Sequence, residues 1–235
     1  FRGASERYGV PADVLEAVAW IATRMVSAQG EIEFEGQPAP WGLFGMRGQA
    51  FADAAYLIGR SVAEVKKSRA LQIEAAAAQL AALASQGGLR RAARDDPLAW
   101  GPVVARFSGL EDAEMAESFA ADVERVLERG LLVPLDDGTS LVIGRHRAGP
   151  PAPDAPVVTR SSGLRTSGTR WRPSPNYNSR GGRRPELIVI HTCEGAYAGC
   201  VSWLRQSRAR VSAHYVVKED GQEISQLVEE RHRAW

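Results

Sequence analysis

The feature that most limits how this chain can fold is a long stretch without hydrophobic periodicity, residues 145–184. It contains the proline-rich run GPPAPDAP, which favours an extended backbone, and the Ser/Gly/Arg-rich run RSSGLRTSGTR. Such a segment offers no regular apolar face to a core, so we interpret it as a linker that can lie along the following domain. The chain is therefore expected to fold as two domains, residues 1–144 and residues 185–235.

The length and the apolar content fit this interpretation. With 235 residues, of which 44% are hydrophobic, the chain can build ordinary cores. No apolar run approaches the length that a membrane span needs, so no transmembrane segment is expected. Because the sequence begins with Phe1 instead of Met, we interpret it as a mature or trimmed fragment from which any export signal has been removed.

The overall net charge of +1 hides a difference between the two halves. Residues 1–144 carry 14 Lys and Arg against 20 Asp and Glu, a balance of −6, whereas residues 145–235 carry 15 against 8, a balance of +7. A basic second half favours an anionic partner or surface. Its basic residues are nearly all arginines scattered without interleaved aromatic residues, so a nucleic-acid partner is not expected.

Helical patterns dominate residues 1–130. Pro11 lies where the first turn of a helix would begin, and apolar residues then recur at helical spacing up to Met25. Further helices are expected over 46–59, 71–83, 97–110 and 113–130. An Asp-Asp-Gly turn between two apolar runs predicts a short hairpin over 131–144.

The last segment has a different pattern, of strand, helix, strand and strand. The run ELIVIH, residues 186–191, is predicted to be a buried strand, and residues 196–207 a short helix. Residues 211–228 predict a hairpin that turns at Asp220 and Gly221. This order is that of the opening half of an α/β domain with a mixed central sheet. We therefore expect an α+β, two-domain protein whose second domain is incomplete at Trp235.

Four motifs of the second domain occur in an order and at separations that identify a family. They are IVIHTCEG at 188–195, VSAHYVVKEDG at 211–221, ISQLVEE at 224–230 and RAW at 233–235. Together with the upstream SPNYNSR, they closely resemble the zinc-dependent N-acetylmuramoyl-L-alanine amidases, which share a fold with the peptidoglycan recognition proteins. The resemblance implies a hydrolase that cleaves the amide bond between N-acetylmuramic acid and the L-alanine of the stem peptide.

The resemblance also implies roles for individual residues. His191 would be a zinc ligand; zinc favours imidazole nitrogen, and the metal would activate the attacking water. The alternative is that His191 only ends a core strand. His214, Tyr197 and Trp235 are expected to bind substrate, although His214 could be purely structural. The remaining zinc ligands and the catalytic acid or base are unknown and expected beyond residue 235.

The implied partner is peptidoglycan, both its glycan strand and its stem peptide, and the implied location is outside the cytoplasm, in the periplasm, the cell envelope or the medium. Because some relatives keep the fold without the chemistry, a non-catalytic muropeptide-binding module is the alternative function. Cys193 and Cys200 could be unrelated core residues, metal ligands or a disulfide; in an exported wall hydrolase we expect the disulfide.

The first domain is similar to the lysozyme-like lytic transglycosylases in Ala4–Arg24 and in the Gly-rich Trp41–Gly48. In that family a glutamate near the end of the second helix is the general acid, but the matching position here is Ala22, which cannot donate a proton. Glu16 would lie on a different face of the helix. We therefore expect an all-α, degenerate lysozyme-like domain that keeps a glycan groove, or a helical packing domain without a ligand. A loop cluster that could in principle supply a carboxylate comprises Glu31, Glu33 and Glu35.

Overall fold

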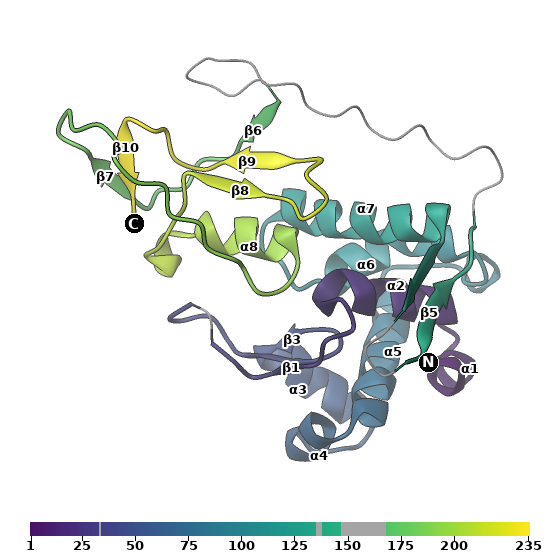
Figure 1. Ribbon diagram of the computed structural model, residues 1–235. Helices are drawn as coiled ribbons and strands as arrows, with labels where there is room; N and C mark the ends of the chain where they lie inside the picture. Colours follow the sequence, from purple (N-terminus) through teal and green to yellow (C-terminus); the bar gives the residue numbers. More distant parts are fainter. Residues whose placement is uncertain (33, 135–137, 147–167) are drawn as a thin grey trace. The chain divides into compact units, whose positions relative to one another are not determined.

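The computed structural model describes residues 1–32, 34–134, 138–146 and 168–235, which are drawn in colour in Figure 1. The chain forms two compact units, the first of residues 1–32 and 38–151 and the second of residues 33–37 and 152–235. Along the chain, the change from one unit to the other after residue 151 falls inside the predicted linker. Each unit is a mixture of helix and sheet.

The first unit is built mainly from helices that pack through small and branched side chains. Val14, Leu15 and Val18 of α2 are fully buried, and Pro11 precedes this helix, as its pattern predicted. The helix α5 is rich in alanine, which lets neighbouring helices approach closely. The helices of the first unit are α1 (Arg2–Tyr8), α2 (Ala12–Thr23), α3 (Gly48–Leu57), α4 (Val62–Lys67), α5 (Arg69–Gln86), α6 (Gly101–Phe107) and α7 (Ala113–Arg129). Two 3₁₀ turns, Arg91–Ala93 and Pro97–Trp100, lie between α5 and α6.

Amphipathic spacing explains the last of these helices. Met115, Phe119 and Val123 recur every four residues along α7 and are buried. On the same helix Glu114, Glu117 and Glu124 face water. Asp112 caps the helix through a hydrogen bond from the Met115 amide. The prediction of a helix over 113–130 is confirmed.

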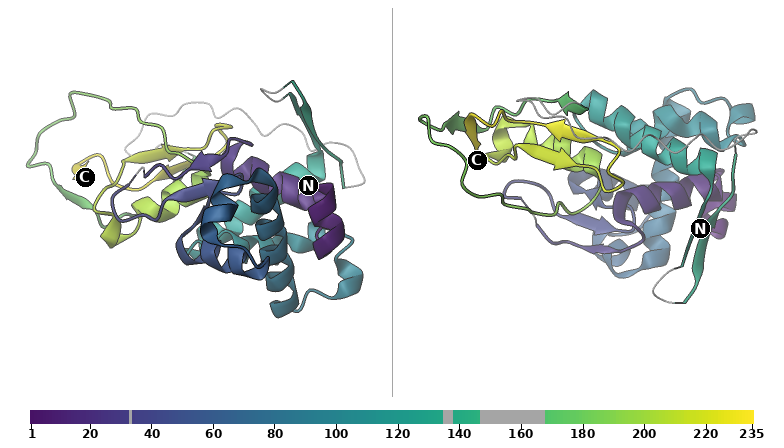
Figure 2. Two further views of the ribbon diagram at one scale, coloured as in Figure 1. Left: turned by 90° about the horizontal axis from the view of Figure 1, so that it is seen from below. Right: turned by 45° about the horizontal axis from the view of Figure 1, so that its top comes forward.

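Two small sheets correct the expectation that this unit is all-α. One has the order β1-β2-β3, and the other is the antiparallel hairpin of β4 and β5. Figure 2 shows this hairpin beside the N-terminus. The predicted Asp-Asp-Gly turn begins outside the described residues. The strands are β1 (Ala28–Gln29), β2 (Pro40–Gly42), β3 (Met46–Arg47), β4 (Leu131–Pro134) and β5 (Ser140–Ile143).

The second unit has a mixed three-stranded sheet of order β6-β9-β8, in which β6 runs parallel and β8 antiparallel to β9. The helix α8 lies against this sheet (Figure 1), and β7 pairs separately with β10. The expected hairpin turn at Gly221 is present, with φ +69° and an amide that donates to the carbonyl of Lys218. The elements are β6 (Thr169–Trp171), β7 (Tyr177–Ser179), α8 (Tyr197–Leu204), a 3₁₀ turn (Ser207–Ala209), β8 (Tyr215–Val217), β9 (Ile224–Gln226) and β10 (His232–Ala234).

The predicted linker is too long at its C-terminal end. Residues 169–171 and 177–179 form β6 and β7, so the end of the expected linker belongs to the second unit. Hydrophobic periodicity missed this segment because its inward side chains are polar: Arg172, Ser174 and Asn176 are each only 2% exposed. Each of them is hydrogen-bonded, which makes burial of a polar group tolerable.

The prediction of a buried strand over 186–191 is wrong for this structure. Residues 183–193 have no regular secondary structure, and the four aliphatic side chains of 187–190 are 85–91% exposed. Both edges of the central strand β9 are occupied, by β6 and β8. A β-branched run becomes a strand only where a partner accepts its hydrogen bonds, and none of the described strands pairs with it.

Within the described ranges, no helix combines the length and the apolar character that crossing a bilayer requires.

Candidate functional site

His191, the predicted zinc ligand, follows the exposed aliphatic run and is itself exposed. Among the residues that the structure describes, no group of three His, Cys, Asp or Glu side chains is placed to hold a metal ion. A catalytic zinc site needs three protein ligands and an open position. The described residues therefore offer His191 as a single candidate ligand and do not fit a complete zinc site.

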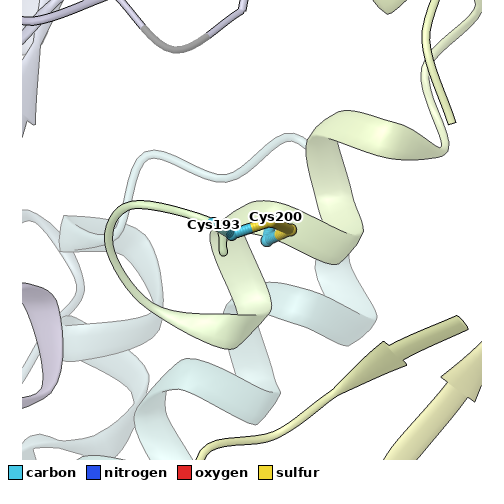
Figure 3. The surroundings of a disulfide bond; sticks show 2 residues. All are labelled: Cys193 and Cys200. Carbon is cyan, nitrogen blue, oxygen red and sulfur yellow. A yellow bond between two sulfur atoms is a disulfide. The ribbon is translucent and has the colours of Figure 1, made fainter. Parts of the chain in front are cut away.

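Two residues beyond His191, a disulfide ties the loop to α8. Cys193 lies in the loop before the helix and Cys200 lies on the helix, with their Cα atoms 6.2 Å apart (Figure 3). This distance is in the range that a disulfide spans. Cys200 is buried at 4% exposure, so the bond joins the loop to a core position.

Tyr197, a predicted substrate-binding residue, is buried in a polar network. Its side chain is 5% exposed, and its hydroxyl lies 2.6 Å from the hydroxyl of Ser225 and 3.3 Å from a guanidinium nitrogen of Arg172. Burial raises the pKa of the Tyr197 phenol above its ordinary value, and the hydrogen bond with Ser225 opposes the shift. The Tyr197 hydroxyl faces the core and holds α8 against the sheet, and substrate contact by Tyr197 stays a prediction.

Arg172 is the centre of that network. Its Nη1 donates to Oε1 of Glu223 at 2.5 Å and to Oγ of Ser225 at 2.7 Å, and its side chain is 2% exposed. A guanidinium is always charged, so its burial requires these partners. The network joins the segment after β6 to β9 and α8.

His214, the second predicted substrate-binding residue, belongs to the contacts that hold β10. Its Nε2 lies 3.0 Å from the backbone carbonyl oxygen of His232, and Nη2 of Arg180 donates to the same oxygen at 2.9 Å. Arg180 also donates through Nε to the carbonyl of Glu230 at 3.2 Å. These contacts fit the structural alternative for His214, and its role in substrate binding stays a prediction.

Trp235 remains available at the surface. Its side chain is 47% exposed, and its indole N–H donates to Oδ1 of Asn178. The backbone of Trp235 is held from both sides, since its carbonyl accepts from the Ser212 amide at 2.8 Å and its amide donates to the Asn176 carbonyl at 3.3 Å. The indole is therefore presented from an anchored position.

A pocket that the sequence did not reveal lies elsewhere on the second unit. Its volume is about 390 Å³, a size suited to a small ligand. The segment after β6 supplies one wall, and the loop before β10 supplies the other. The lining residues are Trp171, Pro173, Ser174, Pro175, Tyr177, Val228, Glu229, Arg231 and His232.

In the first unit, Ala22 lies on α2, at the position where the resemblance predicted from the sequence would place a general acid. Glu16 is partly buried in α2, and burial, with a smaller contribution from Asp13, raises its pKa. Glu31 accepts a hydrogen bond from the Gln29 amide within its own loop. Of the other loop carboxylates, Glu35 is exposed and Glu33 lies outside the described residues.

His146, for which the sequence predicted no role, links the segment after β5 to Asp13 of α2. Its Nε2 lies 2.6 Å from Oδ2 of Asp13, and both side chains are about one quarter exposed. The amide of Gly144 donates to the same carboxylate oxygen at 3.3 Å. Nothing in the sequence signals this contact, because 133 positions separate the two side chains.

Comparisons with known proteins point to one family for the end of the chain. Residues 181–235 match the family described as N-acetylmuramoyl-L-alanine amidase. Over 66 residues the chain is 39% identical to N-acetylmuramoyl-L-alanine amidase A of Achromobacter lyticus, which covers 28% of this chain and 37% of that protein. The chain thus spans little more than a third of the length of this curated relative. A search of the solved structures gave no match.

Proposed function

We propose that the chain acts in the hydrolysis of peptidoglycan, cleaving the amide bond between the N-acetylmuramoyl group and L-alanine. The observation that carries the proposal is the family match over residues 181–235, which includes His191, the disulfide loop and the paired strands β8 and β9. The similarity to the amidase of Achromobacter lyticus supports the same class of substrate. A target in the cell wall also supports an exported protein.

His191 is the residue that we assign to zinc. Its imidazole is exposed and lies two residues before a cysteine that is anchored to α8 by the disulfide. The disulfide limits the positions of the loop, which would reduce the entropy lost when His191 is fixed on a metal. Since the described residues bring no second and third ligand to His191, no catalytic step is assigned to them.

A non-catalytic muropeptide-binding module is the second candidate function. It is favoured by the same observation, that the described residues bring no second and third metal ligand to His191. Without three ligands the second unit would recognise peptidoglycan and leave it intact. Zinc content and product release distinguish the two functions.

For the first unit we propose an inactive lysozyme-like domain that retains affinity for glycan. Ala22 has no proton to donate, and the raised pKa of Glu16 is explained by its burial in the helix. If purified residues 1–146 produced anhydromuramic acid from peptidoglycan well above the blank, the assignment of this domain as inactive would be wrong.

The principal test is incubation of the natural full-length protein with purified peptidoglycan, followed by chromatography of the soluble products. Amidase activity releases stem peptides with free N-terminal L-alanine and leaves the glycan strands intact. A binding module sediments with the polymer and releases no peptide. Release of shortened glycan with its peptides still attached would contradict both proposals.

A further inference from the structure

The segment from Trp171 to Tyr177 alternates between buried and exposed residues in the reverse of the usual sense. A half-buried strand normally turns apolar side chains inward and polar ones outward. Here the inward residues are the polar Arg172, Ser174 and Asn176, and the outward set is apolar and aromatic. The outward residues are Trp171, Pro173, Pro175 and Tyr177.

The inward side chains hold the segment rigidly. Besides the Arg172 network, Oγ of Ser174 donates to the Leu204 carbonyl at 2.6 Å. Nδ2 of Asn176 donates to the carbonyls of Gln206 and Val211 at 2.8 and 2.9 Å. Two prolines further limit the backbone. Each outward side chain is thus presented from a fixed backbone.

The outward side chains form one wall of the 390 Å³ pocket. Trp171 is 44% exposed and Tyr177 is 43% exposed, so both rings have free surface. The ring of Tyr177 packs against the ring of His232, with centroids 4.6 Å apart and the two planes tilted by 39°. The opposite wall adds Glu229 and Arg231, which form an ion pair with each other and whose side chains are 34% and 74% exposed.

We infer that this pocket binds a pyranose ring of the glycan strand. The faces of an aromatic ring carry partial negative charge, and the C–H groups on one face of a sugar ring carry partial positive charge. Flat aromatic and proline surfaces therefore stack on a sugar, while Glu229 and Arg231 offer hydrogen bonds to its hydroxyl and acetamido groups. The inference rests on the proposed function for the identity of the glycan.

The composition of the pocket favours a sugar over the stem peptide. An extended peptide would be held mainly through its backbone, by pairing with an open strand edge. Two of the residues that line the pocket are prolines, which have no N–H to offer to a peptide backbone. Neither His191 nor the disulfide lines it, so the pocket can be tested apart from the proposed metal ligand.

The test measures binding of the 235-residue chain to glycan strands from which stem peptides have been removed, and to N-acetylglucosamine oligomers, by isothermal titration calorimetry. Trp171→Ala should weaken binding about tenfold, as loss of a stacked aromatic ring does. Trp171→Phe keeps an aromatic face and should recover most of the affinity. Val217→Ala is the control in the same unit, because Val217 is 59% exposed on β8 and does not line the pocket.

Arg231→Ala provides a second variant that does not depend on the aromatic ring, and its highly exposed side chain contributes little to folding. It should weaken binding about threefold, the loss of one exposed hydrogen bond. Wild-type protein that fails to bind stripped glycan, or Trp171→Ala that binds it as tightly as wild type, would overturn the inference. Glycan binding by this chain, combined with no stem-peptide release by the natural full-length protein, would overturn the amidase function and leave the pocket assignment standing.

Discussion

Removing the carboxylate that faces Arg172 should destabilise the second unit strongly. Glu223→Ala leaves a guanidinium that is 2% exposed without the partner that lies 2.5 Å away. Breaking a buried ion pair from one side costs about 3–5 kcal/mol. The Glu223 side chain is 22% exposed, so water reaches the site, and Arg172 keeps its hydrogen bonds with Ser225 and Tyr197. We therefore expect a loss of about 3 kcal/mol, the lower end of that range.

Hydrogen exchange of the backbone amides in β9 and α8 measures this loss in the second unit separately from the first. Glu186→Ala is the control, since Glu186 is exposed, and it should change the free energy of opening by less than about 0.5 kcal/mol. Adding Arg172→Met to Glu223→Ala should recover part of the lost stability, because the double variant buries no unpaired charge. A loss below about 1 kcal/mol in Glu223→Ala would show that the network does not hold the unit together.

Three further experiments, two of them on variants, test other parts of the structure. The Glu16 carboxyl has a raised pKa in the folded state, so its ionisation lowers the stability of the first unit as the pH rises from 4.5. Glu16→Gln should therefore stabilise the first unit at pH 7 but not below pH 4.5. Equal effects of the substitution in urea melts at both pH values would contradict this expectation. Thiol titration of the denatured, unreduced protein should find Cys193 and Cys200 oxidised, and reduction should cost about 2 kcal/mol; two free thiols would refute the pairing. Gly42→Ala should lower stability by about 1–3 kcal/mol, since φ is +72° and the added Cβ would lie 2.7 Å from the Gln72 side chain; an unchanged thermal midpoint would exclude this clash.

The parts of the fold that sequence could predict are those in which local patterns agree with tertiary packing. The apolar spacing in α7 and the Gly221 turn identify their elements because each pattern has one stable arrangement. The strand β6 was missed because its neighbours bury polar side chains, which only the partners on β9 and α8 make stable. The pairing of His146 with Asp13 was missed because it depends on the folded first unit.

For the aliphatic run before His191, the sequence predicted a strand that the structure does not contain. Residues 187–190 have strong β propensity, but a strand also requires a neighbour, and no described strand accepts their hydrogen bonds. For Tyr197 the sequence offered an aromatic residue near a candidate ligand, and nothing in it revealed the buried hydroxyl of Ser225. The pocket beside Trp171 was equally hidden, because its two walls come from segments far apart in the chain.

The central claim is that His191 serves a zinc-dependent amidase. The most direct measurement compares His191→Ala with wild type in the natural full-length protein, recording bound zinc and the rate of stem-peptide release from muropeptides. Losing one ligand should lower zinc affinity and activity by at least about tenfold to a hundredfold, while the melting temperature stays nearly unchanged, because the side chain is exposed. His146→Ala, which alters a histidine of the first unit, should keep both zinc and activity. A His191→Ala variant that retains its zinc and its rate would contradict the account.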